Sequence, residues 1–306
     1  MQTRRQFIKS STTLAAMATL APWLPASVLA AEGLIKRKIP SSGEELPVIG
    51  LGTSRTFDVA AADNTAMAPL EAVLQTFVEG GATLIDTAPS YGRAEQITGE
   101  LIHRLGARDK LFLATKVSSV GRDAGRKQIQ ASFKALQTER IDLIQVHNLL
   151  DTRTQLALLR EMKEMGKVRY IGITHYVESS HDDLLEVLQK EKVDFVQFNY
   201  SVGARNAENR LLPYCADHGI ATLVNRAYMQ GNLLTNVKDK PLPPLAKELQ
   251  ATSWAQLLLK FVIANPAVTT VIPATANPRY MADNLLAGRG PLPDAEQREQ
   301  IVKLFS

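Results

Sequence analysis

Thr83-Leu84-Ile85-Asp86 is the stretch that decides the fold, because it joins a short apolar, β-branched run to an acidic side chain at its end. Such a run is typical of a buried strand. Similar runs recur along the chain, at residues 48–51, 111–114, 143–146, 170–173, 195–198, 221–224 and 270–272. The sequence therefore predicts eight strands.

Segments with a helical period separate these runs. Residues 70–78 and 156–165 show this pattern, and Gly80, Gly166 and Gly219 follow such segments as helix stops. Strands that alternate with helices predict right-handed βαβ units and a parallel sheet. Eight such units in about 250 residues have the size of a (β/α)8 TIM barrel. The alternative is an open dinucleotide-binding sheet, which would need a Gly-x-Gly-x-x-Gly after an early strand, and the sequence has none.

A small β-hairpin is predicted ahead of the first barrel strand. Residues 36–39 and 46–48 flank Ser41-Ser42-Gly43, which suits a turn, and the hairpin would cap the bottom of the barrel. No linker or low-complexity segment interrupts residues 31–306. We therefore expect a single domain over this range.

Residues 1–30 have the pattern of a cleavable signal peptide. Three basic residues, Arg4, Arg5 and Lys9, precede an apolar stretch at residues 14–24, and small residues end the segment. Within it, Thr3-Arg4-Arg5-Gln6-Phe7-Ile8-Lys9 resembles the twin-arginine consensus. That resemblance implies export of the folded chain to the periplasm by the twin-arginine translocase.

An uncleaved membrane anchor is the alternative interpretation of the leader. Its apolar run falls short of the roughly 20 residues that a spanning helix needs, and Pro22 and Pro25 interrupt it. We therefore expect no stable membrane association after cleavage.

The charge of the mature chain excludes two classes of partner. The leader holds three of the 35 basic residues and none of the 31 acidic ones, which leaves 32 against 31 and a net charge of +1. A nearly neutral chain gives no reason to expect nucleic acid or an acidic membrane surface as a partner. The single cysteine, Cys215, has no second cysteine for an intramolecular disulfide, which fits a protein that folds before it is exported.

Polar side chains follow three consecutive predicted strands. Asp86, Lys116 and His147 come at the ends of the second, third and fourth strands, and Tyr91 lies in the loop after Asp86. In a TIM barrel the active site lies at the C-terminal ends of the strands. An Asp–Lys pair or a strand histidine can each be structural when taken alone, but together these four residues predict a site.

The four residue types suit acid–base chemistry on an oxygen atom. A tyrosine hydroxyl is a weak acid near neutral pH unless a nearby cation favours its ionised form. Lys116 would be that cation, held by Asp86, and His147 would orient and polarise a carbonyl oxygen. No side chain donates a hydride, so a cofactor is implied.

Two segments carry a resemblance to a known family. Ile49-Gly50-Leu51-Gly52-Thr53 and Leu84-Ile85-Asp86-Thr87-Ala88-Pro89-Ser90-Tyr91-Gly92 resemble the signature of the aldo-keto reductases. Further similar segments follow in order between about residues 46 and 287: residues 132–136, Ile141-Asp142-Leu143, Gly172-Ile173-Thr174, Gln197-Phe198-Asn199-Tyr200 and Val271-Ile272-Pro273. The resemblance implies an NAD(P)H-dependent oxidoreductase that reduces aldehydes or ketones to alcohols, or catalyses the reverse reaction.

The resemblance assigns roles to individual residues. It makes Tyr91 the general acid/base and Lys116 with Asp86 the pair that tunes it. His147 becomes the group that orients the carbonyl. The substrate pocket is less defined, with plausible walls at Phe57, Asn148 and Tyr176, each of which could equally be loop packing.

The cofactor residues match the family less closely. Gln197 stands at the position of a carboxamide ligand, but Thr174-His175 replaces the family's Ser-Asn pair. Arg226, two residues before Tyr228, stands near the position that stacks on the nicotinamide ring. The resemblance places the other cofactor contacts at Thr53, Thr275, Arg279, Tyr280, Asp283 and Asn284.

The family favours NADP(H), with NAD(H) as the alternative. Most members carry a cation soon after the Ile-Pro of the last strand, and this chain has none there. Tyr280 stands where a second cation is expected, and Arg279 is displaced by one position. The sequence therefore predicts only a weak preference for NADPH over NADH.

Two other classes of function remain open. A non-catalytic accessory or redox-sensing protein could use the same fold to bind the cofactor. A metal-dependent barrel hydrolase or lyase would need His-x-His or clustered carboxylates at strand ends. His175 and His181 lack that spacing, so we predict no metal.

Overall fold

The computed structural model describes residues 33–305, so the predicted leader, residues 1–30, lies outside the described part. Eight parallel strands form one sheet in the order β10-β9-β8-β7-β6-β5-β4-β3. Their bounds are β3 Leu51–Gly52, β4 Leu84–Asp86, β5 Phe112–Val117, β6 Ile141–His147, β7 Val168–Thr174, β8 Phe195–Asn199, β9 Ala221–Asn225 and β10 Thr270–Val271. All eight predicted strands are confirmed.

Backbone contacts between the first and last strands close the sheet into a barrel. Isolated bridges join Ile49 to Val271 and Gly52 to Ala274. A Cβ at Gly52 would lie 2.8 Å from the Ile272 carbonyl oxygen, so a larger residue would push the strands apart. The predicted (β/α)8 barrel is therefore the observed fold.

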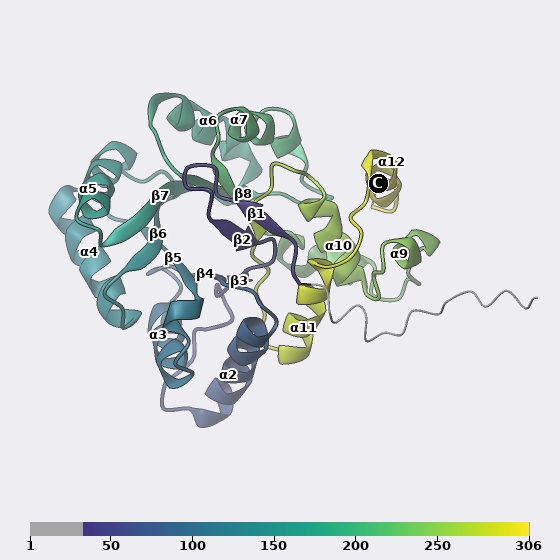
Figure 1. Cartoon of the computed structure of the whole chain (residues 1–306), viewed down its shortest axis with the longest axis horizontal. Coiled ribbons are helices and arrows are strands. Elements are labelled where there is room, and N and C mark those ends of the chain that lie inside the picture. The colour runs from purple at the N-terminus through teal and green to yellow at the C-terminus, as the bar shows by residue number, and fades with distance from the viewer. Residues whose placement is uncertain (1–32, 306) are drawn as a thin grey trace, which may run out of the picture. The chain divides into compact units, whose positions relative to one another are not determined.

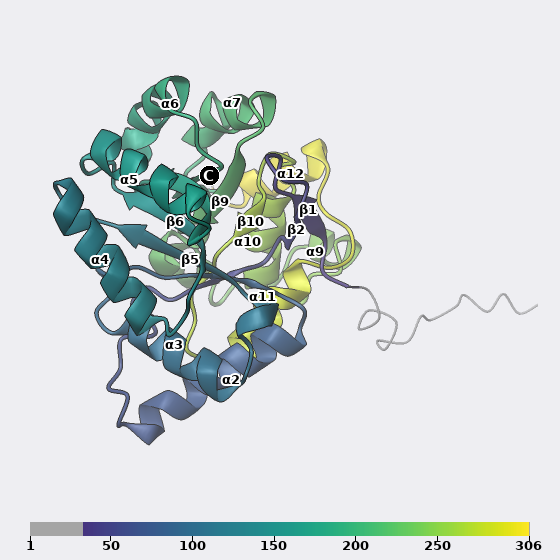
Figure 2. The same cartoon turned by 60° about the vertical axis from the view of Figure 1, so that its left-hand side comes forward.

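Helices surround the strands on the outside (Figures 1 and 2). Their bounds are α2 Asn64–Glu79, α3 Ala94–Arg104, α4 Arg122–Ala135, α5 Thr152–Glu164, α6 His181–Lys190, α7 Leu211–Asp217, α8 Asn232–Asn236, α9 Pro244–Glu248, α10 Trp254–Ile263, α11 Pro278–Ala287 and α12 Ala295–Lys303. Short 3-10 turns complete the chain as η1 Arg108–Lys110, η2 Glu178–Ser180, η3 Asn206–Glu208 and η4 Met229–Gly231. Within residues 33–305, no helix has the length and apolar character needed to cross a membrane.

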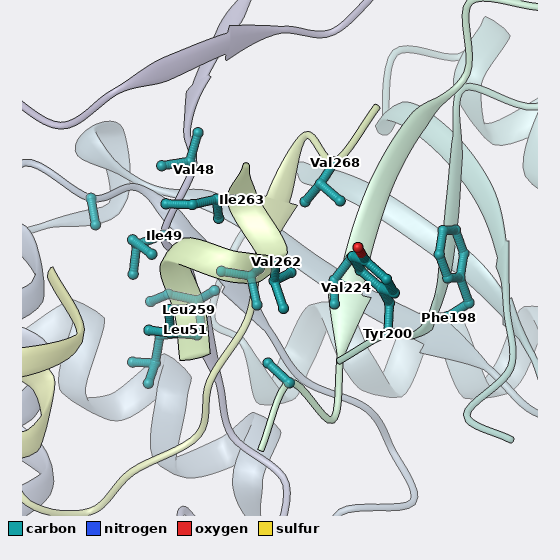
Figure 3. Close-up of a cluster of buried hydrophobic side chains, with 14 of the residues drawn as sticks. Val48, Ile49, Leu51, Phe198, Tyr200, Val224, Leu259, Val262, Ile263 and Val268 are labelled. Carbon is teal, nitrogen blue, oxygen red and sulfur yellow. The ribbon is translucent and has the colours of Figure 1, made fainter. Parts of the chain in front are cut away.

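The larger core cluster fills the space between strands and helices. Figure 3 shows part of it, where Leu259 and Val262 of α10 lie among side chains from the barrel strands, including Leu51 and Val224. Their burial removes apolar surface from water, which is the main force that holds helices against the sheet.

A second cluster fills the bottom of the barrel interior. The antiparallel hairpin of β1 Lys36–Lys38 and β2 Glu45–Pro47 lies across this end (Figure 1). Its Ile39 and Leu46 pack with Phe112 and other inward side chains. The predicted hairpin cap is thus present, and the strands finish at the opposite end of the barrel.

Candidate active site

Three adjacent strands bring the predicted polar residues together. Asp86 and His147 are the last residues of β4 and β6, and Lys116 is the next-to-last residue of β5. Tyr91 lies in the turn that follows β4, where its backbone N–H donates to the Ala88 carbonyl oxygen over 3.1 Å. The side chains therefore gather at the C-terminal end of the barrel, as the sequence predicts.

A buried ion pair forms the base of the site. Lys116 Nζ donates to Asp86 Oδ2 over 2.6 Å and to the Thr87 carbonyl oxygen over 2.9 Å. Burial lowers the pKa of Lys116, but the charges of Asp86 and Tyr91 and their hydrogen bonds outweigh it, so this pKa is raised overall. The ammonium group stays charged and lies 5.0 Å from the centroid of the Tyr91 ring.

His147 also lies close to Tyr91. The two rings meet edge to face, with centroids 6.2 Å apart. Burial, then the charges of Lys116 and His175, lowers the pKa of His147 to about 4. The imidazole is therefore neutral near pH 7, and a neutral ring can still donate one hydrogen bond to a carbonyl oxygen.

The turn that carries Tyr91 is held by a residue that the sequence analysis missed. Asp58 Oδ1 accepts from the backbone N–H of Arg93 over 3.0 Å and from its Nε over 3.2 Å. The Asp58 carboxylate occupies the place of a Cβ at Gly92, whose φ is 62°. A side chain at Gly92 would displace this clamp. In the sequence, the adjacent residues Gly92 and Arg93 are the one sign of this contact with Asp58.

Three predicted cofactor residues are buried, and two of them bond to Asp86. Thr53, Thr174 and Gln197 are almost fully buried. The Thr53 hydroxyl donates to the Asp86 carbonyl oxygen over 3.1 Å. Gln197 Nε2 donates to Asp86 Oδ1 over 2.8 Å, and its Oε1 accepts from Asn225 Nδ2 over 3.3 Å. In this structure the Gln197 amide is thus engaged by the protein itself.

The loop after β7 also engages its own polar atoms. His175 Nδ1 accepts from the backbone N–H groups of Tyr176 and Val177, and its Nε2 lies 3.4 Å from Ser180 Oγ. The Arg226 guanidinium lies 4.2 Å from the centroid of the Tyr176 ring. Arg226 and Tyr176 therefore stack on each other at the barrel mouth, and His175 caps its own loop.

The N-terminus of α11 lies just after the last strand. Asn277 Oδ1 accepts from the Arg279 backbone N–H over 2.9 Å, and Thr275 Oγ1 accepts from the Asn277 N–H over 3.0 Å. The side chains of Arg279 and Tyr280 are exposed and make no hydrogen bond or ion pair within residues 33–305. A helix N-terminus with a free cation suits a phosphate group.

The last two predicted cofactor residues face the protein. The Asp283 carboxylate accepts from Ser253 Oγ and Gln256 Nε2, both over 2.6 Å. Asn284 Oδ1 accepts from the Tyr228 hydroxyl over 2.7 Å. The Asp283 contacts join α11 to the start of α10, and the Asn284 contact joins it to the loop after β9.

The predicted pocket residues differ in exposure. Phe57 is 1 % exposed and packs in the larger core cluster, so its ring offers almost no surface to a substrate. Asn148 and Tyr176 are exposed, and Asn148 has a φ of 52°. Two apolar side chains that the sequence analysis did not single out are also exposed in loops after barrel strands, Val120 after β5 and Leu150 after β6.

No cluster of three or more His, Cys, Asp or Glu side chains that could hold a metal ion occurs within residues 33–305.

Comparison with known proteins shows which family the chain resembles. The model of the "Aldo/keto reductase family" matches residues 48–304. Aldo-keto reductase YhdN of Bacillus subtilis (strain 168) is 32% identical over 220 residues, 66% of this chain and 64% of that protein. The NADH-specific methylglyoxal reductase of Escherichia coli (strain K12) is 29% identical over 210 residues, 60% of this chain and 63% of that protein. The matched part thus spans slightly less than two thirds of either relative.

The fold is also similar to that of a solved structure. The aldo/keto reductase from Klebsiella pneumoniae, solved in complex with NADP and acetate, superposes with a TM-score of 0.71. It is 25% identical, and the match covers 86% of this chain and 93% of the other.

Proposed function

The chain belongs to the aldo/keto reductase family, and from this premise we propose that it reduces aldehydes or ketones to alcohols with NAD(P)H, or catalyses the reverse reaction. One observation carries the proposal. The Lys116 ammonium lies between the Asp86 carboxylate, at 2.6 Å, and the Tyr91 ring, at 5.0 Å from its centroid. A buried cation beside a tyrosine is what a tyrosine general acid needs.

Each residue of the site has a distinct role in this proposal. Tyr91 gives its proton to the carbonyl oxygen as negative charge develops there. Lys116, held by Asp86, stabilises the tyrosinate that remains. His147, neutral at physiological pH, donates a hydrogen bond that orients the carbonyl. The cofactor supplies the hydride that no side chain can supply.

Residues around the barrel mouth would hold this cofactor. The α11 N-terminus with Arg279 and Tyr280 suits the adenosine phosphate end. Thr174, Gln197 and Arg226 lie at the strand ends nearer Tyr91, where the nicotinamide would bind. NADP(H) is favoured by the family, and the Klebsiella structure holds NADP. NAD(H) is the alternative, since one relative is named NADH-specific.

A panel of carbonyl compounds tests the activity. Methylglyoxal belongs in it because a relative is named for that substrate, together with aromatic aldehydes and simple ketones. We expect carbonyl-dependent oxidation of NADPH or NADH at 340 nm. Tight cofactor binding without turnover of any compound would instead favour the accessory or redox-sensing role.

We also propose that residues 1–30 direct export of the folded chain to the periplasm through the twin-arginine translocase. The support is the ordered motif from Thr3 to Lys9. Changing Arg4 and Arg5 together to Lys keeps the charge but removes the guanidinium pair, so export should stop if a receptor reads that pair. Cell fractionation measures the result. Undiminished export of the double variant would contradict the proposal.

A further inference from the structure

Two buried glutamines contact the Asp86 carboxylate from within the barrel. Gln145 Nε2 donates to Asp86 Oδ1 over 3.3 Å, and Gln197 Nε2 donates to the same oxygen over 2.8 Å. The other oxygen, Oδ2, accepts from Lys116 Nζ. The carboxylate is therefore fixed from both sides, by neutral amides on one oxygen and by the ammonium group on the other.

Strand register places Gln145 at this level of the barrel. Gln145 on β6 pairs with Lys116 on β5 and, on its other side, with Gly172 on β7. A Cβ at Gly172 would lie 3.1 Å from Gln145 Cγ. Because Gly172 has no side chain, Gln145 has room for its amide to reach across β5 to Asp86.

The contact comes at a cost to the fold. Gln145 is fully buried, and its Oε1 has no hydrogen-bond partner within residues 33–305. Turning the amide over would bring this oxygen against the Asp86 carboxylate, where the two would repel. A buried acceptor without a partner destabilises a protein. The interior cluster nearer the barrel bottom is apolar, so a leucine at position 145 would avoid this cost.

We propose that Gln145 is a positioning residue for the reaction. Its amide N–H holds the Asp86 carboxylate in the orientation that bonds Lys116, and Lys116 is thereby held beside Tyr91. Within residues 33–305, no hydrogen bond joins the Gln145 side chain to Tyr91 or His147. The inference rests on the proposed carbonyl reduction, because positioning has meaning only if the site turns over a substrate.

A near-isosteric apolar variant separates positioning from packing. Gln145→Leu removes both the donor and the unpartnered oxygen. We expect its kcat to fall by about tenfold, as for loss of a hydrogen bond to a charged group. The Kd for cofactor should stay within about twofold, and the melting temperature should equal or exceed that of the wild type. A role in folding alone predicts the reverse, a lower melting temperature with unchanged kcat.

Thr115→Val is the matched control. The Thr115 hydroxyl donates to Glu95 Oε1 over 2.6 Å, so this variant also removes a buried hydrogen bond to a carboxylate. Thr115 adjoins Lys116 but its hydroxyl faces α3 outside the barrel. We expect a lower melting temperature and a kcat close to that of the wild type. A loss of kcat that tracks the melting temperature equally in both variants would overturn the proposal.

Gln145→Glu adds a second measurement, the pH dependence of kcat, which a purely structural role of Gln145 would not change. A protonated Glu at this position can donate its O–H to Asp86, as the amide does, whereas an ionised one repels the carboxylate. The kcat of this variant relative to wild type should therefore fall by roughly tenfold or more between about pH 5.5 and 8.5. If Gln145→Leu does not fold, this arm decides the matter.

The outcomes distinguish this inference from the proposed function. A wild type that reduces no carbonyl removes the function and, with it, the role of Gln145. A wild type that reduces carbonyls, with Gln145→Leu within twofold of its kcat or with a constant activity ratio for Gln145→Glu across pH, overturns the inference alone.

Discussion

On the side of strands β4 to β6, contacts within the protein hold the polar side chains of the barrel mouth, whereas at the N-terminus of α11 two polar side chains, Arg279 and Tyr280, have no such contact within residues 33–305. Asp86 and Lys116 are almost fully buried and bonded to each other. Arg279 and Tyr280 are exposed and make no side-chain hydrogen bond or ion pair within residues 33–305. The ion pair on the β4–β6 side is therefore satisfied without a ligand, whereas Arg279 and Tyr280 are available to bind one.

This difference predicts where substitutions act on chemistry and where they act on binding. Buried, preorganised groups stabilise the transition state without rearranging. Exposed groups at a helix N-terminus contribute binding energy that is screened by water and salt. Changes on the β4–β6 side should therefore reduce kcat or stability, and changes on the α11 side should mainly shift cofactor affinity.

The largest effect is expected at Tyr91. Tyr91→Phe removes the hydroxyl and leaves the ring, so carbonyl reduction should fall by on the order of 10²- to 10⁴-fold. Cofactor affinity should be almost unchanged, because the hydroxyl acts mainly in the transition state. Steady-state kinetics and a fluorescence titration of NADPH measure the two quantities. A variant with more than about half of wild-type turnover would show that another group is the acid.

The next effect concerns stability at the ion pair. Asp86→Asn leaves the Lys116 charge buried without a counter-ion, which should lower the free energy of unfolding by about 3–5 kcal/mol. Asp182→Asn is the control, since its ion pair with Arg210 is mostly exposed and should matter little. Urea denaturation of both variants tests the contrast. Equal losses would mean that the Asp86–Lys116 pair is not held as tightly as its burial indicates.

The sequence was sufficient to place three candidate residues at or near the ends of strands. Asp86, Lys116 and His147 stand out because each ends or nearly ends an apolar run, and barrel strands end at one face. Gln145 sits within such a run, and nothing local indicates that its amide reaches an aspartate 59 residues earlier. Asp58 was missed for the same reason, because its clamp on Gly92 exists only once two loops have folded together.

His147 provides a pH-dependent effect on the buried side. Its pKa is about 4 in the folded chain, against 6.5 for an ordinary histidine, so the unfolded chain takes up the proton first as pH falls. The free energy of unfolding should therefore decrease between about pH 6.5 and pH 4, by on the order of 3 kcal/mol. The stability difference between wild type and His147→Gln, followed across this range, isolates the contribution. A difference independent of pH would show that the imidazole is not kept neutral.

The smallest effect is expected on the exposed side, in the choice between NADPH and NADH. A charge-assisted contact to the 2′-phosphate is worth roughly 1.5–3 kcal/mol. In the part of the chain that the structure describes, the first turn of α11 offers one candidate cation, Arg279. It is displaced by one position, which turns a helical side chain by about 100°. We therefore expect NADPH to bind better than NADH by less than about tenfold, or roughly 1.4 kcal/mol. Fluorescence titration of both cofactors measures the ratio, and Arg279→Ala should reduce it only slightly. A preference above about a hundredfold that disappears in Arg279→Ala would show that this arginine reaches the phosphate. The bound cofactor would then hold the exposed side chains as firmly as the protein holds the buried ones.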